Sequence, residues 1–396
     1  MAALTVPKYV RQVLITLQSR GYPAYLVGGC VRDMLLGVRP NDWDVCTGAL
    51  PEEVMEVFPS SRPTGLKHGT VTVACGRRSV EVTTFRSEGG YADHRHPDSV
   101  SFVRDLNTDL SRRDFTMNAM ALPPDGLLAD PFGGREDIAA RLIRCVGEPE
   151  RRFEEDALRM LRAVRFAARL DFEIESGTLA AIEKKAYLAS SLAAERVRDE
   201  AEKILLTKKP EYIYTLISLG LMDAFIKKRP DGPGKLPAIA RLPKKALDRW
   251  AALCIILTAQ GCIGSAEEFL TSLRLDSRTV RCCADAAALI SGTRPSDSLG
   301  WKRLLNAYGV DSVSCAALCR DALFEGHAYR ELRAVLKSGE CFSLRHLAVS
   351  GDDLLALGIQ GKELGDTLRF LLDYVMEYPG NNRRELLLSL VSRGEE

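Results

Sequence analysis

Hydrophobic and polar positions follow two different patterns along this chain of 396 residues. From Tyr25 to about Leu128 the apolar runs are short, as in AYLV, GTVTVAC, SVEVTTF and VSFV, and Gly, Pro, Asp or Asn bounds each of them. Such runs are typical of β-strands. Apolar spacing predicts helices between them at residues 31–36 and 51–58. This part of the chain is therefore expected to be an α/β domain.

After DPFGGREDI the pattern changes to helix almost without a break, as in EEDALRMLRAVRFAARL and ERVRDEAEKILLT. Residues 227–237 and 291–300 have the Pro, Gly and Asp density of connecting loops. Residues 1–32 are basic enough to resemble a transit peptide, but their apolar spacing predicts the first helix of the fold. We expect a mixed sheet with flanking helices, followed by all-α modules in an elongated arrangement.

The amino-acid composition limits the classes of protein to which this chain could belong. The chain has 54 basic and 53 acidic side chains, so affinity for nucleic acid must come from local clusters of charge. It contains no run of 18 apolar residues, which excludes a membrane-spanning helix. The eleven cysteines lack paired CxxC spacing, which fits a reduced cytoplasm and no structural zinc. Cysteines 254, 262, 282 and 283 are expected to be small core residues.

Candidate chemistry begins with Asp42 and Asp44 in NDWDVCT. On a strand both carboxylates would project from one face, where Mg²⁺ could join them to a phosphorylated substrate; a solvated turn is the alternative. Glu81 in SVEVTTF is a third acid, either near the metal or an exposed strand charge.

Before the two aspartates in the sequence, LVGGCVRD predicts a strand, a Gly-Gly turn and a helix start with Arg32, which suits a triphosphate. The sequence contains neither GxxxxGK[ST] nor GxGxxG, which argues against a P-loop ATPase and against a dinucleotide-binding enzyme.

A second candidate feature is the arginine-rich stretch RRFEEDALRMLRAVRFAARL. On a helical wheel Asp156 and four arginines fall within about half of the circumference, opposite Leu158, Leu161 and Val164. A solvated amphipathic helix with Glu155–Arg159 pairing is the alternative interpretation. It does not explain why the cations after Asp156 are all arginine. A guanidinium fork beside a carboxylate can imitate a Watson–Crick edge toward a base.

Together with GLKHGTVTV, VEVTTFRSEGGYADHRHPDSVSF, RRDFTMNAMAL and DPFGGREDI, these motifs follow one another over residues 21–205. In this order they resemble the class II group of the polymerase-β-like nucleotidyltransferase superfamily, which contains bacterial CCA-adding enzymes and poly(A) polymerases. The resemblance to CCA-adding enzymes implies template-independent addition and repair of the 3′ CCA of tRNA from CTP and ATP, with two Mg²⁺ ions and release of pyrophosphate. A poly(A) polymerase, a CC- or A-adding enzyme and a catalytically silent RNA-binding scaffold are the alternatives.

The resemblance also implies roles for individual residues. Asp42 and Asp44 would be the catalytic metal ligands, and Asp156 and Arg159 would pair with the base. The other expected nucleotide-binding residues are Gly29, Arg32, Arg113, Arg162 and Arg165, supported by Gly28, Asp33, Glu81, Arg112, Asp114 and Asn118. For Arg112 and Arg113 the alternative is a surface charge, and for Asn118 it is a hydrogen bond within a helix.

The same resemblance divides the chain into four modules. Residues 1–145 would be the catalytic head, and residues 146–205 a neck that selects the base. Residues 206–290 would be an RNA-binding body, and residues 291–396 a tail that holds the tRNA elbow, where LGIQGKELG either binds phosphate or packs. The segment YADHRHPD, with His94 and His96, resembles the family's flexible loop; an ordinary exposed connection is the alternative.

Overall fold

The computed structural model describes residues 6–90 and 99–392, so the expected flexible loop with His94 and His96 lies outside the described residues. The chain forms two compact units that are interleaved in sequence. Unit 1 contains Met1–Ile204 and Thr215–Ala224, and unit 2 contains Leu205–Tyr214 and Phe225–Glu396. Each unit has its own hydrophobic core, and the candidate site residues all lie in unit 1.

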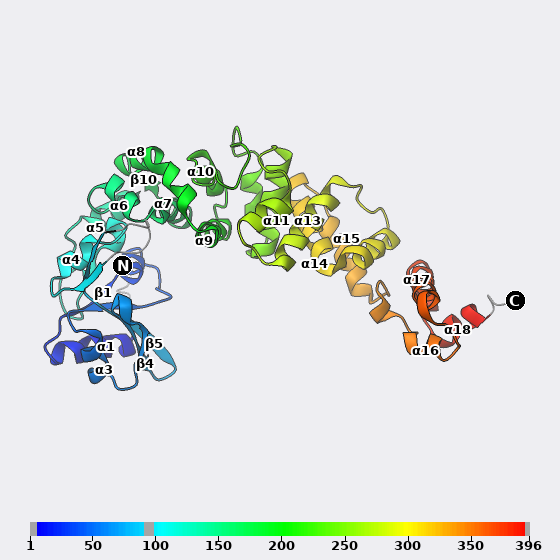
Figure 1. The fold of residues 1–396 in the computed structure, drawn as a ribbon, viewed down its shortest axis with the longest axis horizontal. Coiled ribbons are helices and arrows are strands. Elements are labelled where there is room, and N and C mark those ends of the chain that lie inside the picture. The colour runs from blue at the N-terminus through cyan, green and yellow to red at the C-terminus, as the bar shows by residue number, and fades with distance from the viewer. Residues whose placement is uncertain (1–5, 91–98, 393–396) are drawn as a thin grey trace. The chain divides into compact units, whose positions relative to one another are not determined.

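A six-stranded mixed sheet, in the order β3-β4-β5-β2-β1-β8, forms the centre of the N-terminal part (Figure 1). Its pairs are antiparallel except for β2 and β5, which run parallel. The parallel register places Asp44 opposite Glu81, although the two lie far apart in sequence. The strands are β1 (Ala24–Val27), β2 (Asp44–Thr47), β3 (Arg62–Gly65), β4 (Thr70–Cys75), β5 (Arg78–Thr84) and β8 (Ala121–Leu122).

Helices flank this sheet and bury its apolar positions. α1 packs on β1, and α3 packs on β4 and β5. A core cluster of Val27, Cys46, Phe85, Leu110 and Ala121 joins the sheet to the segments that follow it. The remaining elements here are α1 (Lys8–Ser19), α2 (Gly29–Leu35), α3 (Pro51–Val57), a separate hairpin of β6 (Arg86–Gly89) and β7 (Ser99–Phe102), α4 (Leu106–Ser111), α5 (Gly134–Ala140) and β9 (Leu142–Ile143). The predicted α/β domain and its first helix are confirmed.

Helices follow the sheet within unit 1, with one small addition to the predicted pattern. The two-residue strand β10 pairs in parallel with β9, so the segment after the sheet is not entirely helical. This pairing connects the end of α7 to the head. The helices are α6 (Pro149–Glu155), α7 (Leu158–Leu170), α8 (Ser176–Lys185) and α9 (Ala194–Leu205), and α10 (Tyr212–Ser218) spans the boundary between the units.

Among the described residues of unit 2 the regular elements are all helices, joined by loops (Figure 1). Its α11 is buried along most of its length and packs against α12, α13 and α14. Cys254, Cys262, Cys282 and Cys283 are all buried, as predicted. Gly309, with φ 76°, interrupts α14. The helices are α11 (Ala246–Ala259), α12 (Ala266–Ser272), α13 (Ser277–Ser291), α14 (Ser298–Phe324), α15 (Ala328–Ser338), α16 (Gly351–Leu355), α17 (Gly361–Glu377) and α18 (Arg384–Ser392).

Candidate active site

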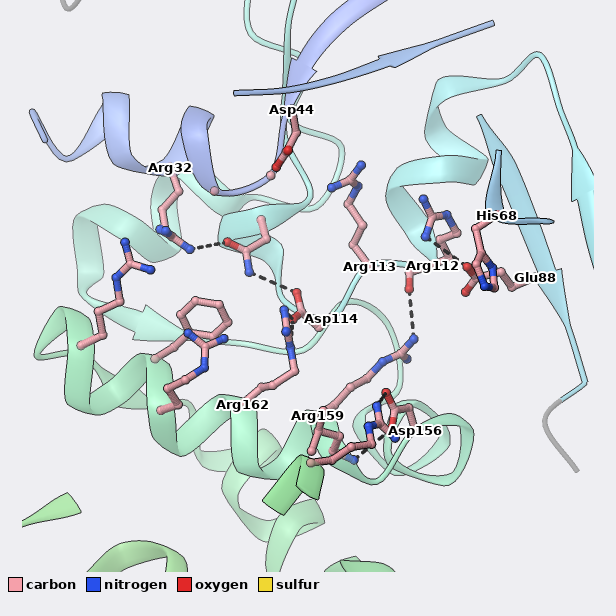
Figure 2. Close-up of a pocket in the computed structure, with 18 of the residues that line it drawn as sticks. Arg32, Asp44, His68, Glu88, Arg112, Arg113, Asp114, Asp156, Arg159 and Arg162 are labelled. Atoms are coloured by element: carbon pink, nitrogen blue, oxygen red, sulfur yellow. Dashed lines mark hydrogen bonds and ion pairs between the residues drawn. The ribbon is translucent and has the colours of Figure 1, made fainter. Parts of the chain in front are cut away.

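A cavity of about 720 Å³ in unit 1 collects most of the predicted residues (Figure 2). Among the described residues, its lining has far more arginines than carboxylates, so it favours a polyanionic ligand. The predicted residues that line it are Gly28, Gly29, Arg32, Asp44, Arg112, Arg113, Asp114, Asn118, Asp156, Arg159, Arg162 and Arg165. Asp33, Asp42 and Glu81 are outside this lining set.

The turn between β1 and α2 brings Asp44 and Arg113 close to the backbone. Gly28 has φ 72°, in the left-handed region that favours glycine. A Cβ atom on Gly28 would lie 3.2 Å from Arg113 Nη1 and 3.9 Å from Asp44 Oδ2. Arg113 is held from its other side by Asp109, with 3.2 Å between Nη2 and Oδ2. The absence of a side chain at Gly28 therefore leaves room for a carboxylate and a guanidinium at the start of α2.

Asp44 is a half-buried carboxylate without a compensating partner. Burial raises its pKa, Glu81 and Asp42 raise it further, and Arg113 acts in the opposite direction. No described residue donates a hydrogen bond to its carboxylate or forms an ion pair with it. A carboxylate surrounded by other carboxylates is stabilised by a cation.

Asp42 differs from its predicted position. The strand expected over DWDVC begins only at Asp44, and Asp42 lies in an exposed bend. The reason is that β1 ends at Val27 and the chain turns away at Gly28, which leaves residues before Asp44 without a partner on that side. The alternation argument that placed both carboxylates on one strand face is therefore wrong. Asp42 still lies near enough to raise the pKa of Asp44, and its role as a metal ligand stays a prediction.

A hydrogen-bonded chain links α2 to α7 across the cavity (Figure 2). Arg162 donates to Asp114 Oδ2 from Nε at 2.8 Å and from Nη2 at 2.6 Å. Asn118 donates to Asp114 Oδ1 at 3.1 Å and accepts from Arg32 Nη1 at 2.8 Å. Burial acts to raise the pKa of Asp114, but Arg162 and Asn118 outweigh it and lower the value to about 2. Asp33 accepts from Arg32 Nη2 at 2.6 Å and so holds the far end of the chain.

Asp156 lies at a break between two helices. α6 ends at Glu155 and α7 begins at Leu158, and Asp156 between them has extended backbone angles. Its Oδ1 accepts the amide of Leu158 at 3.1 Å, the kind of bond by which Asp caps a helix start. The prediction that Asp156 shares one continuous helix face with the arginines is therefore wrong. The break instead turns its carboxylate toward the cavity wall beside Arg159 (Figure 2).

Two of the four arginines of α7 are buried. Arg159 and Arg165 are each only 8% exposed, whereas the side chains of Arg162 and Arg169 are 35% and 45% exposed. The surface-helix alternative is therefore wrong for Arg159 and Arg165, although the Glu155–Arg159 pair that it included is present. Arg159 donates to Glu155 Oε2 at 2.9 Å and to the carbonyl of Arg112 at 3.2 Å. Arg165 pairs with Glu200 of α9. Buried guanidinium groups of this kind are held by specific acceptors, so their directions toward the cavity are set by the fold.

Several lining residues were not predicted. Three guanidiniums surround the Phe166 ring, with Cζ of Arg165 at 4.0 Å, of Arg32 at 5.2 Å and of Arg162 at 5.5 Å from its centroid. Glu88 on β6 accepts from Arg112 Nη1 at 3.1 Å. The motifs that contain such residues were recognised, but apolar spacing alone does not mark a polar side chain for the cavity. The other lining residues outside the prediction are His68, Arg86, Leu158, Arg169 and Arg196.

The donor set at Asp44 fits a hard divalent cation. Asp42, Asp44 and Glu81 offer only oxygen, and burial and the neighbouring carboxylates raise the pKa of Asp44 despite the opposite effect of Arg113. Among the described residues, no three His, Cys, Asp or Glu side chains are grouped so as to hold a metal by themselves. One or two carboxylates can share a divalent cation with water and substrate phosphates.

The sequence matches known protein families and relatives. Residues 24–144 match the poly A polymerase head domain, and residues 171–230 match a probable RNA- and SrmB-binding site of polymerase A. The CCA-adding enzyme of Geobacillus sp. (strain WCH70) is 41% identical over 351 residues, covering 87% of this chain and 85% of that protein. This chain belongs to the CCA-adding enzyme family. The relative from Enterococcus faecalis is 35% identical over 410 residues and covers both chains completely.

Solved structures of CCA-adding enzymes share this fold. The Bacillus stearothermophilus CCA-adding enzyme in complex with CTP superimposes with a TM-score of 0.84 at 34% identity, covering 99% of this chain and 98% of that one. A Thermotoga maritima CCA-adding enzyme complexed with tRNA shares the fold with a TM-score of 0.68 at 22% identity, over 98% of this chain and 96% of that one. The predicted family, fold class and nucleotidyltransferase activity are confirmed. None of the helices in the described part of the chain has the length and apolar character that crossing a bilayer requires.

Proposed function

We propose that this CCA-adding enzyme builds and repairs the 3′-terminal CCA of tRNA from CTP and ATP, without a nucleic-acid template. One observation supports this most directly: a single cavity is lined by the carboxylate of Asp44, by many arginines and by both Asp156 and Arg159. The first suits a metal-assisted displacement, the second a triphosphate, and the third the edge of a base. The relatives that match over most of the chain are CCA-adding enzymes, including one solved with CTP.

In the proposed reaction the 3′-oxygen of the RNA attacks the α-phosphorus of CTP or ATP. A bond forms between that oxygen and phosphorus, the bond from phosphorus to the pyrophosphate oxygen breaks, and the hydroxyl proton passes to solvent. Arg113 and Arg162 offset the charge of the triphosphate, and the backbone at Gly29 lets it approach the start of α2. Asp42 and Asp44 would hold Mg²⁺, which would lower the pKa of the attacking hydroxyl and offset phosphate charge.

The remaining residues position these groups. Asp156 and Arg159 face the base, and Arg165 keeps α7 fixed against α9. Asp114 and Asn118 hold Arg162 and Arg32 in place through the chain of hydrogen bonds. Gly28 leaves the space that the site needs, Asp33 fixes Arg32, Arg112 offers its carbonyl to Arg159, and Glu81 keeps Asp44 in an acidic setting that favours metal binding.

The four modules keep their predicted tasks in this proposal. Residues 1–145 carry out catalysis, residues 146–205 select the base, residues 206–290 bind RNA and residues 291–396 hold the tRNA elbow. In this proposal the reaction takes place in the cytoplasm, which contains tRNA and nucleotides and keeps the free cysteines reduced.

Incorporation of labelled CTP and ATP into tRNA transcripts tests the proposal. Three transcripts, ending at the discriminator base, after one C and after CC, are incubated with Mg²⁺ and each nucleotide. Addition of C, C and then a single A is expected. Asp44→Asn should abolish it, and Asp42→Asn measured separately shows whether the residue in the bend shares the metal. Asp125→Asn is the matched control, because Asp125 pairs with Arg11 at an exposed site.

Other outcomes distinguish the alternatives. A stop after CC, or activity only on the CC end, would indicate a partial enzyme, and a long A tail on unrelated RNA would indicate a poly(A) polymerase. No incorporation on any transcript, with the protein folded and bound to tRNA, would leave the silent scaffold and refute the proposal.

A further inference from the structure

The ring of Phe166 lies where arginines from two helices meet. Arg32 extends from α2 and Arg162 from α7 into the space between these helices (Figure 2). The Cζ atoms of Arg165, Arg32 and Arg162 lie over the ring, at 4.0, 5.2 and 5.5 Å from its centroid. An aromatic face attracts a cation within about 6 Å, so one ring contacts all three charges. The ring is 4% exposed and packs edge-to-face on Phe115, with 5.7 Å between the centroids, which holds it in this position.

Guanidinium groups that converge in this way repel one another. Burial lowers the pKa of Arg165, Glu200 opposes this effect, and the neighbouring charge of Arg162 lowers the pKa again. Each of the three guanidiniums has one carboxylate partner. For Arg32, Arg162 and Arg165 in turn, these partners are Asp33, Asp114 and Glu200. The carboxylates come from different directions, and the ring is the group that the three arginines share.

A neutral ring has an advantage over a further carboxylate at this point. Another carboxylate would also hold the arginines, but it would reduce the positive charge of the cavity and compete with phosphate for guanidinium N–H groups. An aromatic face attracts cations through its quadrupole and carries no net charge. The N–H groups of a guanidinium that lies over a ring point outward in its own plane, where they can donate to a polyanion. All three arginines line the cavity together with the ring.

We propose that Phe166 is a positioning residue, whose ring holds Arg32, Arg162 and Arg165 together as one preformed site for the triphosphate of the incoming nucleotide. The inference rests on the proposed function. Without the attraction of the ring the guanidiniums would move apart in the free enzyme, and each nucleotide would have to draw them together on binding. This cost applies equally to the bound substrate and to the transition state. It should therefore raise KM for CTP and ATP alike and leave kcat nearly unchanged.

Fluorination of the ring tests the proposal, because it weakens the negative face step by step and changes the size of the ring little. Phenylalanine analogues with one, two and three ring fluorines are incorporated at position 166. KM and kcat are measured for CTP and ATP on tRNA transcripts, and equilibrium binding of inorganic tripolyphosphate is measured with Mg²⁺. We expect KM and the tripolyphosphate dissociation constant to rise stepwise, by about 10-fold in total, while kcat changes by less than about twofold. Phe166→Leu removes the negative face altogether and should raise both constants by at least as much.

The same analogues at position 172 are the matched control. Phe172 is also 4% exposed and has the guanidinium of Arg141 over its ring, with Cζ at 5.8 Å from the centroid. It is outside the described lining of the cavity. Fluorination of Phe172 should therefore leave KM, kcat and tripolyphosphate binding unchanged.

A flat series at position 166, or series of equal size at both positions, would overturn the proposal. Weaker CTP binding with unchanged tripolyphosphate binding would also overturn it, because the ring would then act on the nucleoside. A wild type that binds tripolyphosphate and CTP but adds no nucleotide to any transcript would refute the proposed function. A wild type that adds C, C and A, combined with a flat series at position 166, would refute this inference alone.

Discussion

The carboxylate of Asp114 offers the strongest test of how the cavity is held together. Its pKa is lowered from 3.8 to about 2. At about 1.4 kcal/mol per pKa unit, this difference corresponds to about 2.5 kcal/mol of stability at neutral pH. Asp114→Asn keeps an acceptor for the amide of Phe115 but loses the charge that Arg162 and Asn118 stabilise. We expect the variant to lose about 2–3 kcal/mol of unfolding free energy.

The sign of the pH dependence follows from the lowered pKa. The contribution of Asp114 is fully present above the unfolded value of 3.8 and is lost as the pH falls through about 2. The difference in stability between wild type and Asp114→Asn should therefore be constant from about pH 7 to about pH 5 and should shrink below about pH 4.

Tryptophan fluorescence during urea unfolding measures this difference. The chain has three tryptophans. Trp43 is in unit 1, whereas Trp250 and Trp301 are in unit 2, so replacing the last two by Phe makes the signal report unit 1. Asp125→Asn is the control, because its pair with Arg11 is exposed and should contribute at most about 1 kcal/mol. A loss no larger than that of the control, or a difference that stays constant to about pH 3, would refute the reasoning.

Two further predictions concern the turn and the metal carboxylate. Gly28→Ala and Gly37→Ala both place alanine at positive φ and should each cost about 1 kcal/mol, but only at Gly28 would the new Cβ lie 3.2 Å from Arg113 Nη1. Nucleotide incorporation should fall about tenfold or more in Gly28→Ala alone, and equal activity of the two variants would contradict the packing argument. The raised pKa of Asp44 means that its contribution to stability is present at low pH and is lost as the pH rises through its folded value. Asp44→Asn should therefore be inactive but melt at a higher temperature than wild type in metal-free buffer near neutral pH. An unchanged or lower melting temperature would show that the charge of Asp44 does not destabilise the fold.

Local sequence patterns predicted much of this protein correctly, and their failures have physical causes. Short apolar runs and glycine turns mark strands and helix starts because these depend on neighbours in the chain. Asp42 was misplaced because the start of β2 depends on where its partner β1 turns away. Asp156 was misplaced because its carboxylate accepts the amide of Leu158 and ends one helix before the next begins.

Long-range contacts explain what was missed. Arg196 meets Asp156 only after α9 has packed against α7, and nothing in the helical spacing of ERVRDE distinguishes it from the neighbouring charges. Glu81 was predicted as a third acid near the metal or an exposed strand charge, and the sequence left this choice open because the parallel register that places Glu81 beside Asp44 depends on the order of strands in the sheet. Family resemblance, which integrates many positions at once, identified the activity and most of the cavity lining without either contact.

The interleaved boundary between the two units has a consequence for how the gene can be rearranged. Residues 215–224 belong to unit 1 although residues 205–214 before them belong to unit 2. That segment contributes side chains that are almost fully buried: Leu216, Ile217, Leu221 and Met222. Recombination at the end of α9 would separate the catalytic unit from this part of its core. Exchange of RNA-binding modules between related genes would therefore preserve a stable catalytic unit only if the crossover lay beyond Ala224.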